Sequence, residues 1–476
     1  MIEDEALNPA SGRVARNFFA LGLGEALARL VAFAATVYAA RALGPAGFGM
    51  IGVATAVMLY LNRVADGGFD LGLGVREIAA DPRFLERAAP AVLAARQLAA
   101  LGLALGAAGV GFLVLPAPDD AVLAVYAFTL LAVGAGTRWV HLGFERSRRA
   151  ALGMLAGQAL MAALVLLLVR GPGDVAAVAQ AQVAGDLAGA LLLFLWLGPA
   201  VRRLPARLSL EVLEPLLRRG ASLVASALVG LVIYNASFLF LRGLHGAPSV
   251  GYYAAGYALV TFFLNLGTAY SLSLLPSLTR LRATPAGRQG LYHASLAQVF
   301  AVGLPVAVGG TLLAGPIVSL LYGPDYAPAG LPFALLVWSI PLCLARDVPI
   351  MALLAEGRER AVFRLTALAA VVSTLLNLAL IPRFGLLGAA LATILTETGR
   401  LGFALGAARR LGYELPGLRR FARAAGAGVL MAVLLQLLGP RSLLLAVPLG
   451  AAGYGLGLLA LGGLRLRRGA PPMLSV

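Results

Sequence analysis

The chain has 476 residues, of which 60% are hydrophobic and only 13% are charged, and its mean hydropathy is +0.88. Soluble globular chains average about 45–50% apolar and about 25% charged residues, so this composition excludes a soluble globular protein and indicates a polytopic α-helical membrane protein. The formal net charge is +16 with one cysteine and no lysine, which excludes a disulfide framework and also a Walker A loop, because that loop needs a lysine for the nucleotide phosphates.

Apolar runs of roughly 20 residues recur between charged or Pro/Gly breaks, and each is long enough to cross ~30 Å of hydrocarbon as a helix. The first run follows the acidic stretch MIEDEALNP and has no small-residue cleavage site, which argues against a cleaved signal peptide. In chain order the runs predict about fourteen membrane-spanning helices, at residues 17–40, 47–70, 91–115, 120–140, 150–169, 175–198, 220–241, 250–275, 291–314, 331–350, 362–381, 386–408, 422–438 and 442–464.

Arginines alternate between rich and poor connectors along the chain. The connectors on the side of the two termini carry 27 arginines, and the connectors on the other side carry 5. Because basic loops are retained in the cytoplasm during insertion, both termini are predicted to be cytoplasmic. A miscounted helix would disturb this alternation, so the charge distribution supports the count independently.

The longest basic connector, LGPAVRRLPARLSLEVLEPLLRRG (197–220), follows the sixth predicted helix. It divides the chain into two sets of six helices and leaves a final pair. The predicted domains are an N-lobe (1–200, helices 1–6), a cytoplasmic basic linker (201–218), a C-lobe (219–408, helices 7–12) and a C-terminal pair, helices 13 and 14 (409–476).

Weak self-similarity relates the two sets of helices. Arg41, Gly49 and Asn62 recur as Arg242, Gly251 and Asn265, at offsets of 201, 202 and 203 residues. Each set has an even number of helices and starts inside, so both have the same orientation in the membrane. Transporters built from such a parallel repeat bind their substrate between the halves.

Three stretches resemble one family of membrane proteins. VYAARALGPAGFGMIGVATAV (37–57), SLLYGPDYAPAG (319–330) and NLALIPRFGLLGAALATILTE (377–397) resemble Wzx-type oligosaccharide flippases, in the polysaccharide transporter family of the multidrug/oligosaccharidyl-lipid/polysaccharide (MOP) exporter superfamily. The resemblance covers about residues 13–465. The motifs contain residues that favour turns. Gly44-Pro45 and the segment from Pro382 to Gly385 are expected to end one helix and begin the next.

The resemblance implies an all-α fold with two six-helix lobes in a V-shaped, MATE-like arrangement, plus the two C-terminal helices. It implies a flippase of the bacterial inner membrane that moves undecaprenyl-diphosphate-linked oligosaccharide from the cytoplasmic to the periplasmic leaflet by alternating access, for O-antigen, exopolysaccharide or capsule biosynthesis. The expected partners are that glycan lipid, the bilayer and the polysaccharide polymerase machinery, with no nucleic acid. No cofactor is expected, and coupling to H⁺ or Na⁺ is left open.

Charged side chains inside the spans are the candidate substrate site. Arg29 lies twelve residues into the first span, roughly 18 Å at 1.5 Å per residue and near the midplane. Arginine pairs two phosphate oxygens and stays charged when partly desolvated, so Arg29, Arg63 and Arg400 are predicted to bind a diphosphate from an inward-opening cavity. Glu25 is predicted to hold Arg29 in place. The alternative is that Glu25 and Arg29, four residues apart, only neutralise each other as a packing pair.

Three further arginines border the spans. Arg96, Arg138 and Arg346 lie close to the inner ends of their helices. A long side chain reaches the lipid headgroups from such a position. We therefore expect these three to be structural.

Four acidic residues are predicted as ion-coupling groups or counter-ions: Asp66, Asp70, Asp186 and Glu397. Asp186 lies near the middle of the sixth helix and is either a proton or sodium site or the counter-ion of Arg29. Glu397 precedes Arg400 by one helical turn. Asp66 and Asp70 flank a Gly-Gly pair that loosens the inner end of the second helix, and helix-end polar residues are the simpler interpretation.

Amide side chains are also present in mid-span, at Asn62, Gln158, Asn235, Asn265 and Asn377. Hydrogen bonding between helices is their usual role. For Asn62 and Asn265, contact with the sugar of the substrate is the alternative.

The outer connectors and the deep charges also bear on other functions. A polysaccharide polymerase or a lipid-dependent glycosyltransferase usually presents sizeable outer loops with catalytic acids and histidines, whereas the most elaborate outer connector here, YGPDYAPAG (322–330), holds one acid. Within the superfamily, a peptidoglycan lipid-precursor flippase and a multidrug or cation antiporter are the alternatives. An exporter of organic cations would favour an acidic cavity, and the deep arginines favour an anionic headgroup.

Overall fold

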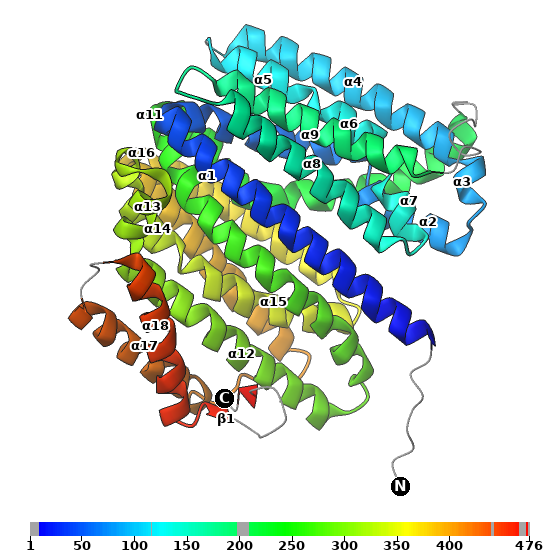
Figure 1. Ribbon diagram of the computed structural model, residues 1–476. Helices are drawn as coiled ribbons and strands as arrows, with labels where there is room; N and C mark the ends of the chain where they lie inside the picture. Colours follow the sequence, from blue (N-terminus) through cyan, green and yellow to red (C-terminus); the bar gives the residue numbers. More distant parts are fainter. Residues whose placement is uncertain (1–8, 116, 198–208, 439–441, 466–472, 475–476) are drawn as a thin grey trace. The chain divides into compact units, whose positions relative to one another are not determined.

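The computed structural model describes residues 9–115, 117–197, 209–438, 442–465 and 473–474. The first eight residues of the predicted basic linker (201–218) fall in the stretch 198–208, outside the described residues, and residues 210–218 are helical. The described chain is almost entirely helical, which confirms the all-α fold class (Figure 1).

The helices follow one another with short connections. The first ten are α1 (Pro9–Asp66), η1 (Phe69–Leu73), α2 (Gly74–Ala80), α3 (Phe84–Arg87), α4 (Ala89–Val114), α5 (Asp119–Ala127), α6 (Thr129–Ala135), α7 (Arg138–Gly143), α8 (Ser147–Leu168) and α9 (Val175–Leu195). After these come α11 (Leu210–Arg280), α12 (Pro285–Leu312), α13 (Ala314–Tyr322), η2 (Pro324–Ala329), α14 (Gly330–Leu336), α15 (Ser339–Ala355), α16 (Glu359–Arg409), α17 (Arg419–Leu438) and α18 (Leu443–Ala460). Two-residue strands, β1 (Leu464–Arg465) and β2 (Met473–Leu474), pair antiparallel near the C-terminus.

Eleven helical segments of the described chain are long and apolar enough to cross a membrane. Three of them, in α1, α11 and α16, have 45, 55 and 51 residues, far more than the ~20 that one crossing needs. Each contains one residue with non-helical backbone angles, which is Gly44, Gly246 or Gly385. If each of the three makes two crossings, the eleven segments are compatible with the fourteen spans expected from the sequence. The count itself stays a prediction.

The three bends coincide with the turns expected from the sequence. Gly44 has φ 69° and ψ 177°, and Gly246 has φ 80° and ψ 178°. This region of backbone space is essentially restricted to glycine, which explains why a Gly-Pro or Gly-Ala-Pro sequence follows each preceding helix. The two glycines are 202 residues apart in the chain, the same offset as the sequence repeat. The repeat is therefore reproduced in the backbone geometry.

The chain divides into two compact units, unit 1 (Met1–Leu231) and unit 2 (Val232–Val476). The division falls within α11, so the first 22 residues of that helix belong to unit 1. The domain boundaries expected from the sequence remain a prediction.

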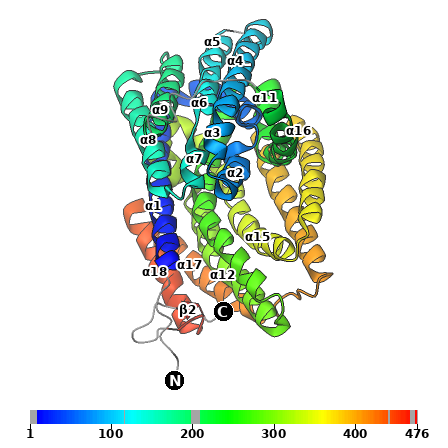
Figure 2. The same cartoon turned by 90° about the vertical axis from the view of Figure 1, so that its right-hand side faces the viewer.

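Unit 1 is held together by contacts of α1 with α8 and of α8 with α9. In both views α8 lies beside α9, and α4 beside α5 (Figure 2). The α8–α9 pair is close because a glycine faces a glycine: a Cβ at Gly157 would lie 2.7 Å from the carbonyl oxygen of Gly185, and a Cβ at Gly189 would lie 3.0 Å from that of Gly153. Both helices thus carry a Gly-x-x-x-Gly motif, which lets membrane helices approach backbone to backbone.

In unit 2 the long helices α11 and α16 lie side by side. Three hydrogen bonds join them, Ser373 Oγ to the carbonyl of Ile233 (3.3 Å), Ser237 Oγ to Asn377 Oδ1 (2.8 Å) and the hydroxyl pair Tyr253–Thr393 (3.0 Å). All three partners are 140 residues apart, so the two helices run in the same direction in one register. His245 Nε2 also lies 2.9 Å from the carbonyl oxygen of Ile381, close to both bends.

A polar cluster ties the loops at one end of unit 2. Glu356, the C-cap of α15, accepts hydrogen bonds from Arg282 Nε (3.0 Å), Arg288 Nη1 (2.9 Å) and the Tyr413 hydroxyl (3.1 Å). Burial, and to a lesser extent the Glu356 carboxylate, raises the pKa of Tyr413 to about 12, so this hydroxyl remains a donor at neutral pH. The cluster joins the start of α12 and the segment that follows α16 to the end of α15.

Candidate functional site

Glu25, Arg29 and Arg138 form a group of three charged side chains. Glu25 on α1 accepts a hydrogen bond from Arg138 Nη2 at 2.5 Å, and Arg29 Nη2 lies 3.5 Å from its other carboxylate oxygen. The Glu25–Arg29 pair expected from the four-residue spacing is present. The closer partner is Arg138, which begins α7 and is 113 residues away in the chain. Arg29 and Arg138 keep 40% and 33% of their side chains exposed, so part of each side chain remains accessible beside one shared carboxylate.

Arg63 and Asn62 follow on the second part of α1. Arg63 is half-buried and forms no ion pair or hydrogen bond with the residues that the structure describes. Asn62 Oδ1 is buried and has no hydrogen-bond partner among them. Asn265, the repeat-related amide in α11, is also half-buried. The buried, unpaired oxygen distinguishes Asn62 from Asn265.

Asp66 and Asp70 form a buried ion network with Arg96. Arg96 Nη2 lies 3.0 Å from Asp66 Oδ1 and 3.4 Å from Asp70 Oδ2, and its guanidinium also donates to the carbonyls of Val133 and Gly136 at 2.8 and 2.9 Å. Asp66 and Arg96 are only 3% and 4% exposed. The expectation that Arg96 extends to the lipid headgroups is wrong, because two carboxylates and two carbonyls bind it inside unit 1.

Asp66 and Asp70 do lie where a helix ends. Asp66 is the last residue of α1, and Gly67 and Gly68 follow with φ values of 63° and 88°. The Asp66 carboxylate accepts a hydrogen bond from the backbone N–H of Asp70 at 3.0 Å. The helix-end interpretation of the sequence therefore holds, and the ion pair with Arg96 is added to it.

A cavity of about 260 Å³ lies between α6, α7, α8 and α9. Its polar lining comes from Asp70, Arg138, Gln158 and Asp186, and its apolar lining is rich in the glycines of the α8–α9 contact. Asp186 accepts a hydrogen bond from Gln182 Nε2 at 2.9 Å. Within the described residues it forms no ion pair with Arg29, so the counter-ion of Arg29 is Glu25. Asp70 and Asp186 thus line one cavity although 116 residues separate them in the chain.

Unit 2 contains a second buried ion network. Glu397, 1% exposed, lies 2.5 Å from Arg346 Nη1 and 2.6 Å from Arg400 Nη1. The hydroxyl of Tyr234 on α11 accepts hydrogen bonds from both guanidinium groups, at 3.0 and 2.7 Å. Asp347 Oδ1 is 2.7 Å from Arg346 Nη2. Two arginines and two acids balance in charge, and the expectation that Arg346 extends to the headgroups is wrong.

Tyr234 and Asp347 were missed in the sequence. An Arg-Asp pair inside an apolar run was the available signal for Asp347, because two adjacent opposite charges at that depth need each other or a neighbour. No local signal distinguishes Tyr234 from the other tyrosines of α11. The mid-span amide Asn377 has the expected role, since it accepts from Ser237 and donates to the carbonyl of Ser373 at 2.8 Å.

No three His, Cys, Asp or Glu side chains gather closely enough in the described ranges to hold a metal ion.

Comparison with known families gives two matches. The family described as "Lipid II flippase MurJ" matches residues 163–445. The family described as "Polysaccharide biosynthesis protein" matches residues 14–282, more than half of the chain. The chain belongs to the polysaccharide biosynthesis protein family. This membership confirms the resemblance to MOP-superfamily flippases that the outer turns indicated.

A curated relative of the chain is also named as a flippase. "Probable flippase AglR" of Haloferax volcanii is 30% identical over 224 residues, which are 44% of this chain and 47% of that protein. The chain thus matches about half the length of this curated relative.

Solved structures show the same fold. The lipid II flippase MurJ in an inward closed conformation has a TM-score of 0.77 at 12% identity, covering 93% of this chain and 98% of that one. An inward-facing multidrug resistance MATE transporter of the MOP superfamily has a TM-score of 0.65 at 16% identity, covering 80% and 94%. At such identities the likeness concerns the fold alone.

Proposed function

We propose that this protein is a flippase that moves an undecaprenyl-diphosphate-linked oligosaccharide from the cytoplasmic to the periplasmic leaflet by alternating access. It would act in the bacterial inner membrane, with both termini cytoplasmic, in O-antigen, exopolysaccharide or capsule biosynthesis. Family membership and the flippase names of the matched relatives support this proposal. The glycan lipid is the proposed substrate, and the polymerase machinery is the proposed downstream partner.

The observation that carries the proposal is the pair of partly exposed arginine side chains that share Glu25. Arg29 and Arg138 share this one carboxylate within an apolar membrane segment, and both remain more than a quarter exposed. A charge at the bilayer centre is costly, at about 2.5–3.5 kcal/mol for an arginine on insertion scales. A diphosphate would offset that cost, because arginine pairs phosphate oxygens with two parallel hydrogen bonds.

Arg63 is the second proposed phosphate contact. It is half-buried near the end of α1 and has no acidic partner among the described residues. Arg400 differs, since its guanidinium is bound by Glu397 and Tyr234. We therefore assign substrate contact to Arg29 and Arg63, and a structural role to Arg400 and Glu397. Asn62 stays a proposed sugar contact because its oxygen is buried and unpaired.

Ion coupling is proposed at the polar cavity of unit 1. Asp70 and Asp186 both line it, and the Asp70 Oδ1 atom is buried without a hydrogen-bond partner among the described residues. Such carboxylates can exchange a proton or sodium ion as the cavity opens. The Asp66–Arg96 pair would hold the Asp70 backbone in place.

The experiment is replacement of a known oligosaccharide flippase in a deletion strain. We expect the wild-type chain to restore surface polysaccharide, and Arg29→Ala and Arg63→Gln to abolish export with near-normal protein levels in the membrane. Arg364→Ala, which removes an exposed charge from unit 2, is the control and should export normally. Normal export by Arg29→Ala would show that export does not need this arginine and would contradict the proposed mechanism.

A peptidoglycan lipid-precursor flippase is the second candidate, because the MurJ family matches residues 163–445. Both cargoes carry the same diphosphate lipid, so the arginines do not separate them. Growth of a strain depleted of its lipid II flippase, rescued by this chain, would favour the second candidate. Rescue in the oligosaccharide strain alone would favour the first.

A further inference from the structure

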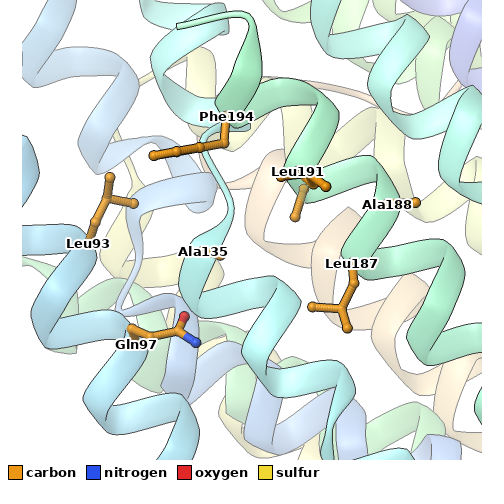
Figure 3. A pocket seen from close by; sticks show the side chains of 8 residues that line it. Leu93, Gln97, Ala135, Leu187, Ala188, Leu191 and Phe194 are labelled. Atoms are coloured by element: carbon orange, nitrogen blue, oxygen red, sulfur yellow. The ribbon is translucent and has the colours of Figure 1, made fainter. Parts of the chain in front are cut away.

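A second cavity of unit 1 opens between α4, α6 and α9, with a volume of about 510 Å³. Its walls are apolar apart from one amide. Figure 3 shows the lining side chains, which are Leu93 and Gln97 of α4, Ala135 of α6, and Leu187, Ala188, Ala190, Leu191 and Phe194 of α9. We call it the α4–α9 groove.

The mouth of the groove is continuous with an apolar, exposed surface. Leu98 and Leu101 of α4 are exposed on one side, and Leu191 and Leu195 of α9 on the other. Exposed leucines on membrane-spanning helices face lipid chains. Water is a poor occupant of the groove, because a buried water needs two to four polar partners and Gln97 alone offers any.

Gln97 and Phe194 stand at opposite ends of the groove (Figure 3). Gln97 is the ninth residue of α4, and its Oε1 atom is buried without a hydrogen-bond partner among the described residues. At the end of α9, Phe194 is followed by Trp196, a residue type that prefers the membrane interface. The exposed Arg149 donates a hydrogen bond from Nη1 to the Trp196 carbonyl at 3.1 Å. A cation therefore stands near the Phe194 end of the groove, away from Gln97.

We propose that the α4–α9 groove binds one anionic phospholipid of the bilayer. An acyl chain enters the apolar groove at its Phe194 end, and Arg149 pairs with the phosphate. The hydrocarbon thus meets apolar walls and the headgroup meets a cation. The proposal does not depend on which glycan the protein moves.

The test is native mass spectrometry of the full-length protein in detergent with phosphatidylglycerol or phosphatidylcholine. Ala188→Trp places an indole in the groove, and Leu191→Trp is a second groove-filling change at a more exposed position. Both should raise the Kd for phosphatidylglycerol about tenfold, or about 1.4 kcal/mol. Leu105→Trp, on the exposed face of α4 outside the groove, should bind as the wild type does.

The headgroup contact is tested separately. Arg149→Ala should remove the preference for phosphatidylglycerol over phosphatidylcholine, whereas Arg360→Ala, which removes an exposed charge from unit 2, should keep it. Equal binding by the groove-filling variants and the wild type would overturn the proposal. Equal loss in the groove-filling variants and Leu105→Trp would overturn it as well, because the bound lipid would then not be in the groove.

Discussion

Neutralising Glu397 should destabilise unit 2 because its carboxylate is bound by two arginines and is almost fully buried. In Glu397→Gln the side chain keeps its shape and loses its charge. Arg346 retains Asp347 at 2.7 Å, whereas Arg400 loses its one acidic partner among the described residues and keeps the Tyr234 hydroxyl. Removing one partner of a buried pair costs about 3–5 kcal/mol. The Arg400 side chain is 14% exposed, so we expect the lower end, about 3 kcal/mol.

Thermal unfolding of the detergent-purified protein measures the effect. For a unit of this size, 1 kcal/mol corresponds to about 2–4 °C, so the midpoint should fall by about 6–12 °C. The double variant Glu397→Gln/Arg400→Gln restores the charge balance and should recover at least half of that loss. A midpoint within 2 °C of the wild type for Glu397→Gln, which is roughly below 1 kcal/mol, would refute the buried-pair reasoning. A double variant no more stable than the single one would refute the assignment of Arg400 as the uncompensated charge.

Three further predictions concern unit 1 and the bends. Gly157→Ala should lower the amount of folded protein in the membrane, since its Cβ would lie 2.7 Å from a backbone oxygen, whereas Gly106→Ala in α4 has open space and should be neutral by fluorescence size-exclusion chromatography. Arg96→Met should lower the unfolding midpoint by an amount that corresponds to about 3–5 kcal/mol, because Asp66 is left buried and unpaired, and an unchanged midpoint would contradict the network. Gly44→Ala should be destabilised by about 1–3 kcal/mol of backbone strain. Gly102→Ala, where a Cβ also meets open space, is the control. Equal yields and unfolding midpoints for the two variants would show that the bend does not require glycine.

The bends were predictable because they depend on local sequence. The long-range ion pairs were not predictable from the sequence. Gly44 and Gly385 stand in Gly-Pro and Pro-Arg-Phe-Gly contexts whose backbone preferences are set within a few residues. Arg96 was assigned to the headgroups from its depth alone. Depth along a helix gives the distance of a side chain from the lipid interface. It does not reveal that another helix places a carboxylate 3.0 Å from that side chain.

The candidate site shows the same limit. The Glu25–Arg29 pair follows from helical spacing, whereas the Arg138 contact joins residues 113 apart and depends on how α7 packs on α1. The shared cavity of Asp70 and Asp186 could likewise not be read from the chain. The charge distribution identified which residues carry the chemistry, and the packing of the helices decided which of them meet.

The register between α11 and α16 restricts how unit 2 can deform. Hydrogen bonds at Ile233 and Ser237 lie before the bend at Gly246, and the one at Tyr253 lies after it, each matched 140 residues later. A change of angle at only one bend would displace the bonded residues of that helix relative to their partners in the other helix. We therefore expect α11 and α16 to move together, with the bends at Gly246 and Gly385 changing in concert.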